Sequence, residues 1–182
     1  QYVGLSNFYD FLEHQLNFKP LQDLDSYQYG IALGGLEADA LTLAHYLTLF
    51  PGDGVLKPLR LFLDRPGGEQ IIPTPMSGLT NEKKIVEPGL AQLVSKVLND
   101  RITGVEQFGL VSNLNLFQNN YAVKTGTSRD YHDSWTVGYT PDFLVVTWLG
   151  NVENTPLKRI TGQSGAGAIW NDSMELLLNS EY

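Results

Sequence analysis

The chain has 182 residues, of which 42% are hydrophobic and 18% charged, so it has the size and composition of one globular domain or a large part of one. A formal net charge of −8, with no runs of lysine or arginine, argues against nucleic acid as a partner. The sequence holds no cysteine, which excludes disulfides and thiolate metal sites, and no apolar stretch that approaches the ~20 residues of a membrane span.

The first helix is expected to begin at Ser6 or Asn7, either of which can accept a hydrogen bond from the free N–H groups of the first turn. Its apolar residues share one face: Phe8, Phe11, Leu12 and Leu16. Residues 20–35 are interrupted by a proline and a glycine and end in Gly34-Gly35, which predicts a turn.

A second helix is predicted to start at Asp39 and to direct four residues inward: Leu41, Ala44, Leu47 and Thr48. Residues 51–54 end this helix because they contain a proline and two glycines. The next ten residues, 55–64, look extended. Residues 64–80 are rich in proline and glycine and look like a loop.

The third helix has the clearest signals, with Glu87 at its cap and Pro88 at its first helical position. Its apolar stripe consists of Leu90, Leu93, Val94, Val97 and Leu98. A last helix is predicted from about Ala168. It carries its large apolar side chains on one side: Trp170, Met174, Leu177 and Leu178.

Three strands are predicted between these two helices: Ala122–Thr127, Trp135–Thr140 and Leu144–Leu149. The second alternates Trp135, Val137 and Tyr139 with Ser134, Thr136 and Gly138, which is typical of a half-buried strand. The third is apolar on both faces, which predicts a central position. We therefore expect an antiparallel meander with the last helix packed across it, and an α+β fold of helices on an antiparallel sheet.

The segment Lys124-Thr125-Gly126-Thr127 places a cation and two hydroxyls at the end of the first strand. Gly126 has no Cβ, so a ligand can approach the strand edge closely. Thr125 and Thr127 lie on the same face of a strand, so both hydroxyls can meet one ligand. Such an edge suits a carboxylate and a developing oxyanion. The tripeptide alone is a weak signal, because a solvated lysine beside a glycine turn also explains it.

With these residues the sequence resembles the transpeptidase domain of the penicillin-binding proteins, most closely the class A type. Lys124-Thr125-Gly126 matches the third of the motifs S-x-x-K, S-D-N and K-T-G of that serine acyl-transferase group. Residues 122–151 resemble the lysine strand and its two partner strands almost position for position. Three further segments are similar to the family: 29–62, 87–100 and 165–174. The resemblance implies a fold of the β-lactamase and transpeptidase type.

The resemblance also implies a function, namely peptidoglycan D,D-transpeptidation by serine acyl transfer on D-alanyl-D-alanine stem peptides, with β-lactam binding in the complete domain. In that reading Lys124 stabilises negative charge and supports proton movement. Thr125 and Thr127 hydrogen-bond the substrate carboxylate, and the backbone N–H of Thr127 supplies one arm of the oxyanion hole. Gly126 leaves room for the substrate along the strand, and Ser128 completes the substrate-binding set. The reaction implies no cofactor.

The other two motifs are absent. No serine is followed three positions later by lysine or two positions later by asparagine, and Ser95 and Lys96 are adjacent. In the family both motifs precede such a segment, and this sequence begins at Gln1. We therefore expect residues 1–182 to be the C-terminal portion of a transpeptidase domain, inactive alone, with the N-terminal half as its partner. The family implies the bacterial cell envelope, on the periplasmic face, and a parent anchored in the inner membrane.

Three alternatives stay open. A D,D-carboxypeptidase and a serine β-lactamase of the same fold share the motif strand, although the tryptophan-containing hairpin favours the class A transpeptidase. A binding module that kept the sheet and lost the nucleophile belongs to another functional class. A serine and lysine at S-x-x-K spacing upstream of Gln1 would distinguish the enzyme from the binding module.

The remaining polar residues are weaker candidates. His14, His45 and His132 share no ligand spacing, so we expect no metal site. The first two are expected to lie on helix surfaces or to be partly packed, whereas His132, in the loop after the motif, is a lesser candidate for substrate contact. The same loop holds a predicted charged turn of Arg129, Asp130 and Asp133. The tryptophans are expected in the core: Trp135, Trp148 and Trp170.

Overall fold

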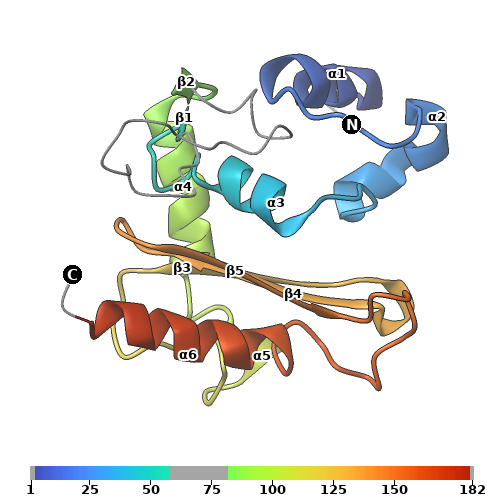
Figure 1. The fold of residues 1–182 in the computed structure, drawn as a ribbon. Coiled ribbons are helices and arrows are strands. Elements are labelled where there is room, and N and C mark those ends of the chain that lie inside the picture. Colours follow the sequence, from blue (N-terminus) through green and yellow to red (C-terminus); the bar gives the residue numbers. More distant parts are fainter. Residues whose placement is uncertain (1–2, 58–81, 181–182) are drawn as a thin grey trace, which may run out of the picture. The chain divides into compact units, whose positions relative to one another are not determined.

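The computed structural model describes residues 3–57 and 82–180 and divides the chain into two compact units, Gln1–Glu87 and Pro88–Tyr182 (Figure 1). Its helices and antiparallel sheets confirm the predicted α+β class. Most of the segment expected to be extended, and the loop predicted at 64–80, lie outside the described residues. No helix in the described parts is long and apolar enough to cross a membrane.

The first unit consists of short helices and a two-stranded ladder. Its elements are α1 (Leu5–Asp10), η1 (Phe11–Gln15), α2 (Leu24–Tyr27), η2 (Gln28–Leu33), α3 (Ala40–Leu47), β1 (Val55–Leu56) and β2 (Lys83–Lys84), with the two strands paired antiparallel. Three buried side chains, Leu12, Tyr27 and Ile31, form its core, against which Phe8 and Leu16 pack. The apolar face predicted for the first helix is therefore used in packing.

The start of α1 differs from the prediction. The helix begins at Leu5, and its cap residue is Gly4, whose φ of 79° lies in the left-handed region. Ser6 and Asn7 therefore lie inside the helix, and no side chain caps it. Glycine adopts this backbone conformation without a steric penalty, so the chain can turn into the helix two residues earlier than a serine cap would place it.

Residues 24–33 form two short helices, α2 and η2, and the chain is interrupted between them at Gln28, whose φ of 49° and ψ of −146° are not helical. The sequence predicted a break in this segment but placed it at Gly30. Tyr27 and Ile31 are buried there, and this burial outweighs the weak helix propensity of the glycine between them. Gly34 follows with φ 86°, in the left-handed conformation, so the turn predicted at Gly34-Gly35 is present.

Helix α3 begins after Asp39, as predicted, and the Asp39 carboxylate accepts a hydrogen bond from the backbone N–H of Thr42 at 2.9 Å. The inward face was predicted only in part. Ala44, Leu47 and Thr48 are half-buried, but Leu41 is 50% exposed. His45, expected on the helix surface or partly packed, is only 2% exposed, and a pattern of apolar residues alone does not reveal a buried histidine.

Burial of His45 makes the first unit sensitive to acid. Its Nδ1 has no hydrogen-bond partner among the described residues. Burial lowers the pKa of His45 below the usual 6.5 because the cation loses hydration, and a hydrogen bond with the Lys57 backbone offsets part of this effect. Well above pH 6.5 the ring is neutral in both the folded and the unfolded chain. Below it the unfolded chain takes up a proton first, so stability falls.

We expect His45→Gln to reduce the loss of stability between about pH 7 and pH 5, because glutamine does not titrate. The measurement is the urea midpoint of the chain at a series of pH values, followed by circular dichroism. His14→Gln is the matched control, since His14 is exposed. Equal pH dependence of the parent and His45→Gln would contradict a buried, neutral His45.

The second unit contains the meander. Its elements are α4 (Pro88–Asn99), α5 (Val105–Phe108), β3 (Ala122–Thr127), η4 (Arg129–Tyr131), β4 (Asp133–Tyr139), β5 (Leu144–Gly150) and α6 (Ala166–Leu178). The strands are antiparallel in the order β3-β4-β5, as predicted. Helix α6 packs against β4 and β5, and α4 packs against β3 (Figure 1).

The two faces of the sheet meet different helices. Val123 and Gly138 are ladder partners on the α6 face, where Val123 packs in the core around Trp170. A Cβ at Gly138 would lie 2.2 Å from the Trp170 ring, so this position requires glycine. Tyr139 points to the other face, where its hydroxyl lies 2.9 Å from Ser95 Oγ on α4.

Strand β4 is covered on both faces, not half-exposed as its alternating pattern predicted. Ser134 and Thr136, on the face assigned to water, are each 0% exposed. Their hydroxyls donate hydrogen bonds to the backbone oxygens of Thr161 and Gly162, both at 2.8 Å. The polar residues alternate because they bind another segment of the chain, and a periodicity of two cannot distinguish this from solvent.

Strand β5 lies at an edge of the described sheet and β4 is its central strand, so the central position predicted for β5 is not found among the described strands. One face of β5 packs through Val145 against the core, but Trp148 on the other face is 40% exposed. Trp148 Nε1 donates to Asp133 Oδ1 at 2.9 Å, and its ring lies 6.3 Å from that of Trp135. Only Trp170, at 0% exposure, is fully buried in the core as predicted.

Helix α4 begins at Pro88, as predicted, but most of its apolar stripe is uncovered within the second unit. Leu90, Leu93 and Val97 are 52%, 57% and 66% exposed, and the buried residue is Ala91. The helix thus presents a row of apolar side chains that no described segment of its own unit covers.

Candidate functional site

Strand β3 carries Lys124-Thr125-Gly126-Thr127 at an edge of the sheet, since β4 is its only neighbour among the described strands. In the ladder Lys124 pairs with Val137, and Thr127 pairs with Ser134. The outer edge of such a strand presents backbone N–H and C=O groups with which an extended ligand can pair.

Lys124 and Gly126 lie on the α4 face of the strand, because side chains alternate and Val123 faces α6. Lys124 is exposed, and its Nζ donates to the backbone oxygen of Thr125. In the described parts of the chain no carboxylate lies within salt-bridge distance of it. The Lys124 ammonium is therefore available to an anionic ligand. On the same face, a Cβ at Gly126 would lie 3.4 Å from Trp135 Cβ.

Thr125 and Thr127 lie together on the opposite, α6 face. Thr127 Oγ1 accepts a hydrogen bond from the backbone N–H of Gly162 at 2.9 Å, which leaves the hydroxyl proton free to be donated. Thr127 is exposed and Thr125 half-buried. A ligand that meets both the ammonium of Lys124 and these hydroxyls must therefore lie along the strand edge, where the two faces meet.

Ser128 closes the loop that follows the motif. Its Oγ accepts from the backbone N–H of Asp133 at 2.7 Å, and its own N–H donates to the Asp133 oxygen at 3.0 Å. Between them Asp130 and Tyr131 adopt left-handed φ values of 57° and 61°. Ser128 thus holds a tight, strained loop, and its hydroxyl proton is still available for donation to a ligand.

The loop places the other polar candidates at its surface. His132 Nδ1 lies 2.7 Å from the backbone oxygen of Asn154, so this nitrogen carries a proton and donates it to that oxygen. Arg129 and Asp130 form an exposed pair at 3.9 Å, in agreement with the predicted charged turn. Asp133 instead accepts from a tryptophan on β5. These contacts hold His132 in the loop, and none of them joins it to Lys124.

A cleft of ≈ 560 Å³ adjoins the motif strand between α4, α5 and β3. Its apolar lining includes Leu93, Val97, Phe108, Leu114 and Val123. Its cations are Lys96, Arg101 and Lys124. The Arg101 guanidinium lies over the Phe108 ring at 5.7 Å and donates to Asn115 Oδ1 at 3.2 Å. Sequence reasoning missed Lys96 and Arg101, because only the packing of α4 beside β3 brings them near Lys124.

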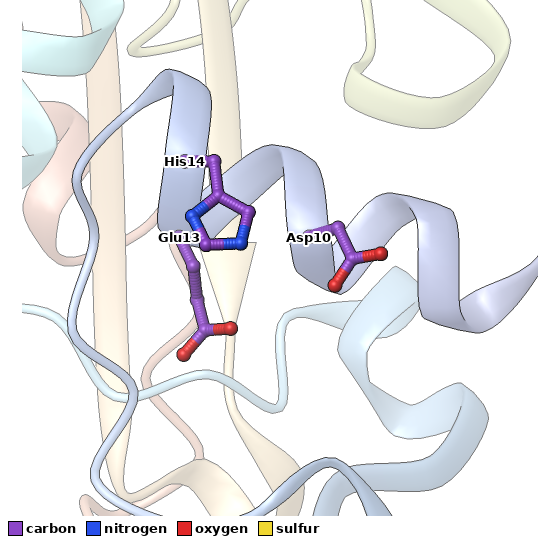
Figure 2. Close-up of side chains that lie close together, drawn as sticks. All are labelled: Asp10, Glu13 and His14. Carbon is purple, nitrogen blue, oxygen red and sulfur yellow. The ribbon is translucent and has the colours of Figure 1, made fainter.

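Asp10, Glu13 and His14 form the one cluster within the described residues whose ligand atoms lie close enough to hold a metal ion, all within 4.8 Å of one another (Figure 2). Asp10 lies on α1, and Glu13 and His14 lie about one helical turn further on, in η1, so the spacing of the histidines alone does not reveal the cluster. All three are exposed, and exposed acidic groups commonly lie together without an ion. The cluster alone does not define a metal site.

No protein-family model matches the chain, but two proteins similar to it in sequence share one name. The chain is 28% identical over 163 residues to penicillin-binding protein 1A of Aquifex aeolicus, which covers 86% of this chain and 21% of that protein. It is 25% identical over 155 residues to penicillin-binding protein 1A of Neisseria meningitidis serogroup B, covering 83% and 19%. The chain thus spans about a fifth of the length of these relatives.

The fold agrees with this similarity. The crystal structure of penicillin-binding protein 1A from Haemophilus influenzae matches 98% of this chain and 32% of that chain, with a TM-score of 0.67 and 21% identity. The similarity in sequence and the similarity in fold were both expected from the motif strand and its two partner strands. The chain is therefore similar in sequence to proteins named penicillin-binding protein 1A, and similar in fold to one of them, as its resemblance to the penicillin-binding proteins predicts.

Proposed function

We propose that the chain is the C-terminal portion of a peptidoglycan D,D-transpeptidase domain, which transfers an acyl group from D-alanyl-D-alanine stem peptides through a serine and binds β-lactams when complete. One observation carries the proposal. Lys124-Thr125-Gly126-Thr127 lies on the edge of β3 that no described strand pairs with, and an exposed ammonium and two threonines are within reach of a ligand along that edge. The relatives named penicillin-binding protein 1A support the same reading.

Each residue has a role that follows from its chemistry. The Lys124 ammonium stabilises negative charge as the acyl intermediate forms and supports proton movement near the nucleophile. The hydroxyls of Thr125 and Thr127 donate to the substrate carboxylate, and Ser128 contributes its remaining proton beside them. The Thr127 backbone N–H is one arm of the oxyanion hole. Gly126 lets the substrate pair with the strand as an added strand.

The nucleophile comes, in this proposal, from a segment outside the 182 residues. No serine in the sequence has lysine at the third following position. Ser95, beside Lys96, makes its hydrogen bond with Tyr139, and Ser128 is bound to Asp133. The exposed stripe of α4, Leu90, Leu93 and Val97, offers an apolar surface on which the N-terminal half of the domain packs.

The proposed setting is the bacterial cell envelope, on the periplasmic face, within a parent anchored in the inner membrane. Peptidoglycan stem peptides and β-lactams are the proposed partners, with no nucleic acid and no cofactor. A D,D-carboxypeptidase or serine β-lactamase would use the same strand, so product analysis has to separate hydrolysis from cross-linking. A non-catalytic binding module is the outcome to accept if the upstream segment has no S-x-x-K serine.

The isolated chain is expected to form no covalent adduct with a labelled β-lactam, because nothing in it generates an activated nucleophile. Mixing it with the N-terminal half of the domain, supplied as a separate chain, should restore labelling on a serine of that other chain. Intact-mass spectrometry measures both results. A stable adduct on any residue of the isolated chain would overturn the proposal.

A further inference from the structure

The segment Thr161-Gly162 lies against the α6 face of the motif strand and is held there by a row of hydroxyls. The Gly162 N–H donates to Thr127 Oγ1 at 2.9 Å, and the Gly162 oxygen accepts from Thr136 Oγ1 at 2.8 Å. One residue further back, the Thr161 oxygen accepts from Ser134 Oγ at 2.8 Å. A distant segment of the chain therefore contacts the motif through a single glycine.

Gly162 approaches the strands too closely for a side chain. A Cβ there would lie 2.7 Å from the Trp135 oxygen, 2.8 Å from Thr125 Cβ and 2.9 Å from the Gly126 oxygen. Two of these atoms are backbone atoms of the sheet, which cannot move aside without breaking the ladder. Residue 162 must be glycine because there is no space for a side chain. This close approach places the Gly162 N–H directly under the Thr127 hydroxyl.

The contact determines how Thr127 can bind. A hydroxyl has one proton, and because Thr127 Oγ1 accepts from Gly162, that proton is free to be donated to another group. Thr136, which holds the Gly162 oxygen, is 0% exposed, so water does not compete for that bond. Thr136 and Gly162 together bias Thr127 towards donating to an anion.

We propose that Gly162 and Thr136 are positioning residues that orient the Thr127 hydroxyl as a donor to the carboxylate of the ligand. The inference rests on the proposed function for the identity of that ligand, but the geometry belongs to this chain alone. Neither residue touches the ligand. Each acts through the hydrogen bond chain from Thr136 to Gly162 to Thr127.

The first experiment tests this geometry on the chain as it is. In amide hydrogen exchange, the Gly162 N–H should be protected, and Thr127→Val should accelerate its exchange about tenfold or more. Thr136→Val should do the same through the lost bond to the Gly162 oxygen. Thr147→Val is the matched control, since Thr147 is a buried neighbour of Thr136 on β5 and makes no described bond to Gly162. Unchanged exchange in Thr127→Val would overturn the inference.

The second experiment measures acylation by a β-lactam in the complete protein. Thr127→Val and Thr136→Val should each slow acylation about tenfold or more, the effect of losing or misdirecting a hydrogen bond to a charged group. The same β-lactam as its methyl ester should show less than about a threefold effect, because the charge is absent. In a Thr127→Val background, Thr136→Val should add nothing further. Thr147→Val should acylate at the parent rate.

The outcomes separate the two proposals. A complete protein that does not acylate at all contradicts the proposed function, while hydrogen exchange still decides whether Gly162 holds Thr127. Slow acylation by Thr127→Val with a parent rate for Thr136→Val overturns the positioning role alone. The positioning role is also overturned if the variants slow acylation by the β-lactam acid and by its methyl ester equally. A purely structural defect would affect both ligands in the same way.

Discussion

Lys124→Ala in the complete protein should lower the rate of acylation by a β-lactam about 10²–10³-fold, the usual effect of removing one preorganised group from a developing oxyanion. Stability should change by less than about 0.5 kcal/mol, because the side chain is exposed and its described bond is to the adjacent Thr125 oxygen. The ammonium acts on a charge that grows in the transition state, so the rate changes more than the folding free energy.

Lys96→Ala is the control for this experiment. Lys96 lies on α4, is exposed, and lines the same cleft, so its removal takes away the same charge without touching the motif strand. Its acylation rate should stay within about threefold of the parent, since a screened surface charge contributes little. A parent rate for Lys124→Ala, measured by stopped-flow labelling, would show that Lys124 is not catalytic.

Among the substitutions considered, Trp170→Ala should lower the free energy of unfolding most, by about 3–5 kcal/mol. Trp170 is 0% exposed, and it packs in the core with Tyr121, Val123 and Met174. Its removal leaves a cavity between α6 and the sheet, which the rigid ladder cannot close. Urea denaturation followed by circular dichroism measures the change. Ile169→Ala, adjacent on α6 and 49% exposed, should lose much less.

A second substitution tests the same packing from the other side. Gly138→Ala should destabilise the parent by about 1–3 kcal/mol, because its Cβ would lie 2.2 Å from the Trp170 ring. In a Trp170→Ala background the same change should lose less than about 0.5 kcal/mol, since the ring is absent. Additive losses in the double variant would contradict direct contact between Gly138 and Trp170.

The strands were predictable because local signals agree there. Alternation, the proline of Thr140-Pro141-Asp142 and the apolar run after it together define two strands joined by a tight turn. In the structure the backbone N–H of Thr140 donates to the Phe143 oxygen at 2.8 Å, and Thr140 Oγ1 accepts from the N–H of Asp142 and Phe143. Contacts between distant segments were not predictable, since no spacing within β4 reveals that Ser134 and Thr136 bind residues 161 and 162.

The same limit applies to the candidate site. Sequence reasoning selected Lys124 and its neighbours from a short motif, and β3 does place them on an exposed edge. It overlooked Gly162, one of several glycines in its stretch of sequence, because only the folded sheet shows which of them lies under Thr127. A close approach between segments 35 residues apart leaves no periodic signal in either.

The placement of the tryptophans has a spectroscopic consequence. Trp135, Trp148 and Trp170 all lie in the second unit, and the sequence contains three tryptophans in total. Indole emission therefore reports the second unit alone, whereas the first unit is visible only through its tyrosines and its circular dichroism. Trp135 pairs with Gly126 in the ladder, so we expect a ligand at the edge of β3, as the proposed function requires, to change the polarity around this indole. Trp135 emission would then report binding at the motif strand without an added label.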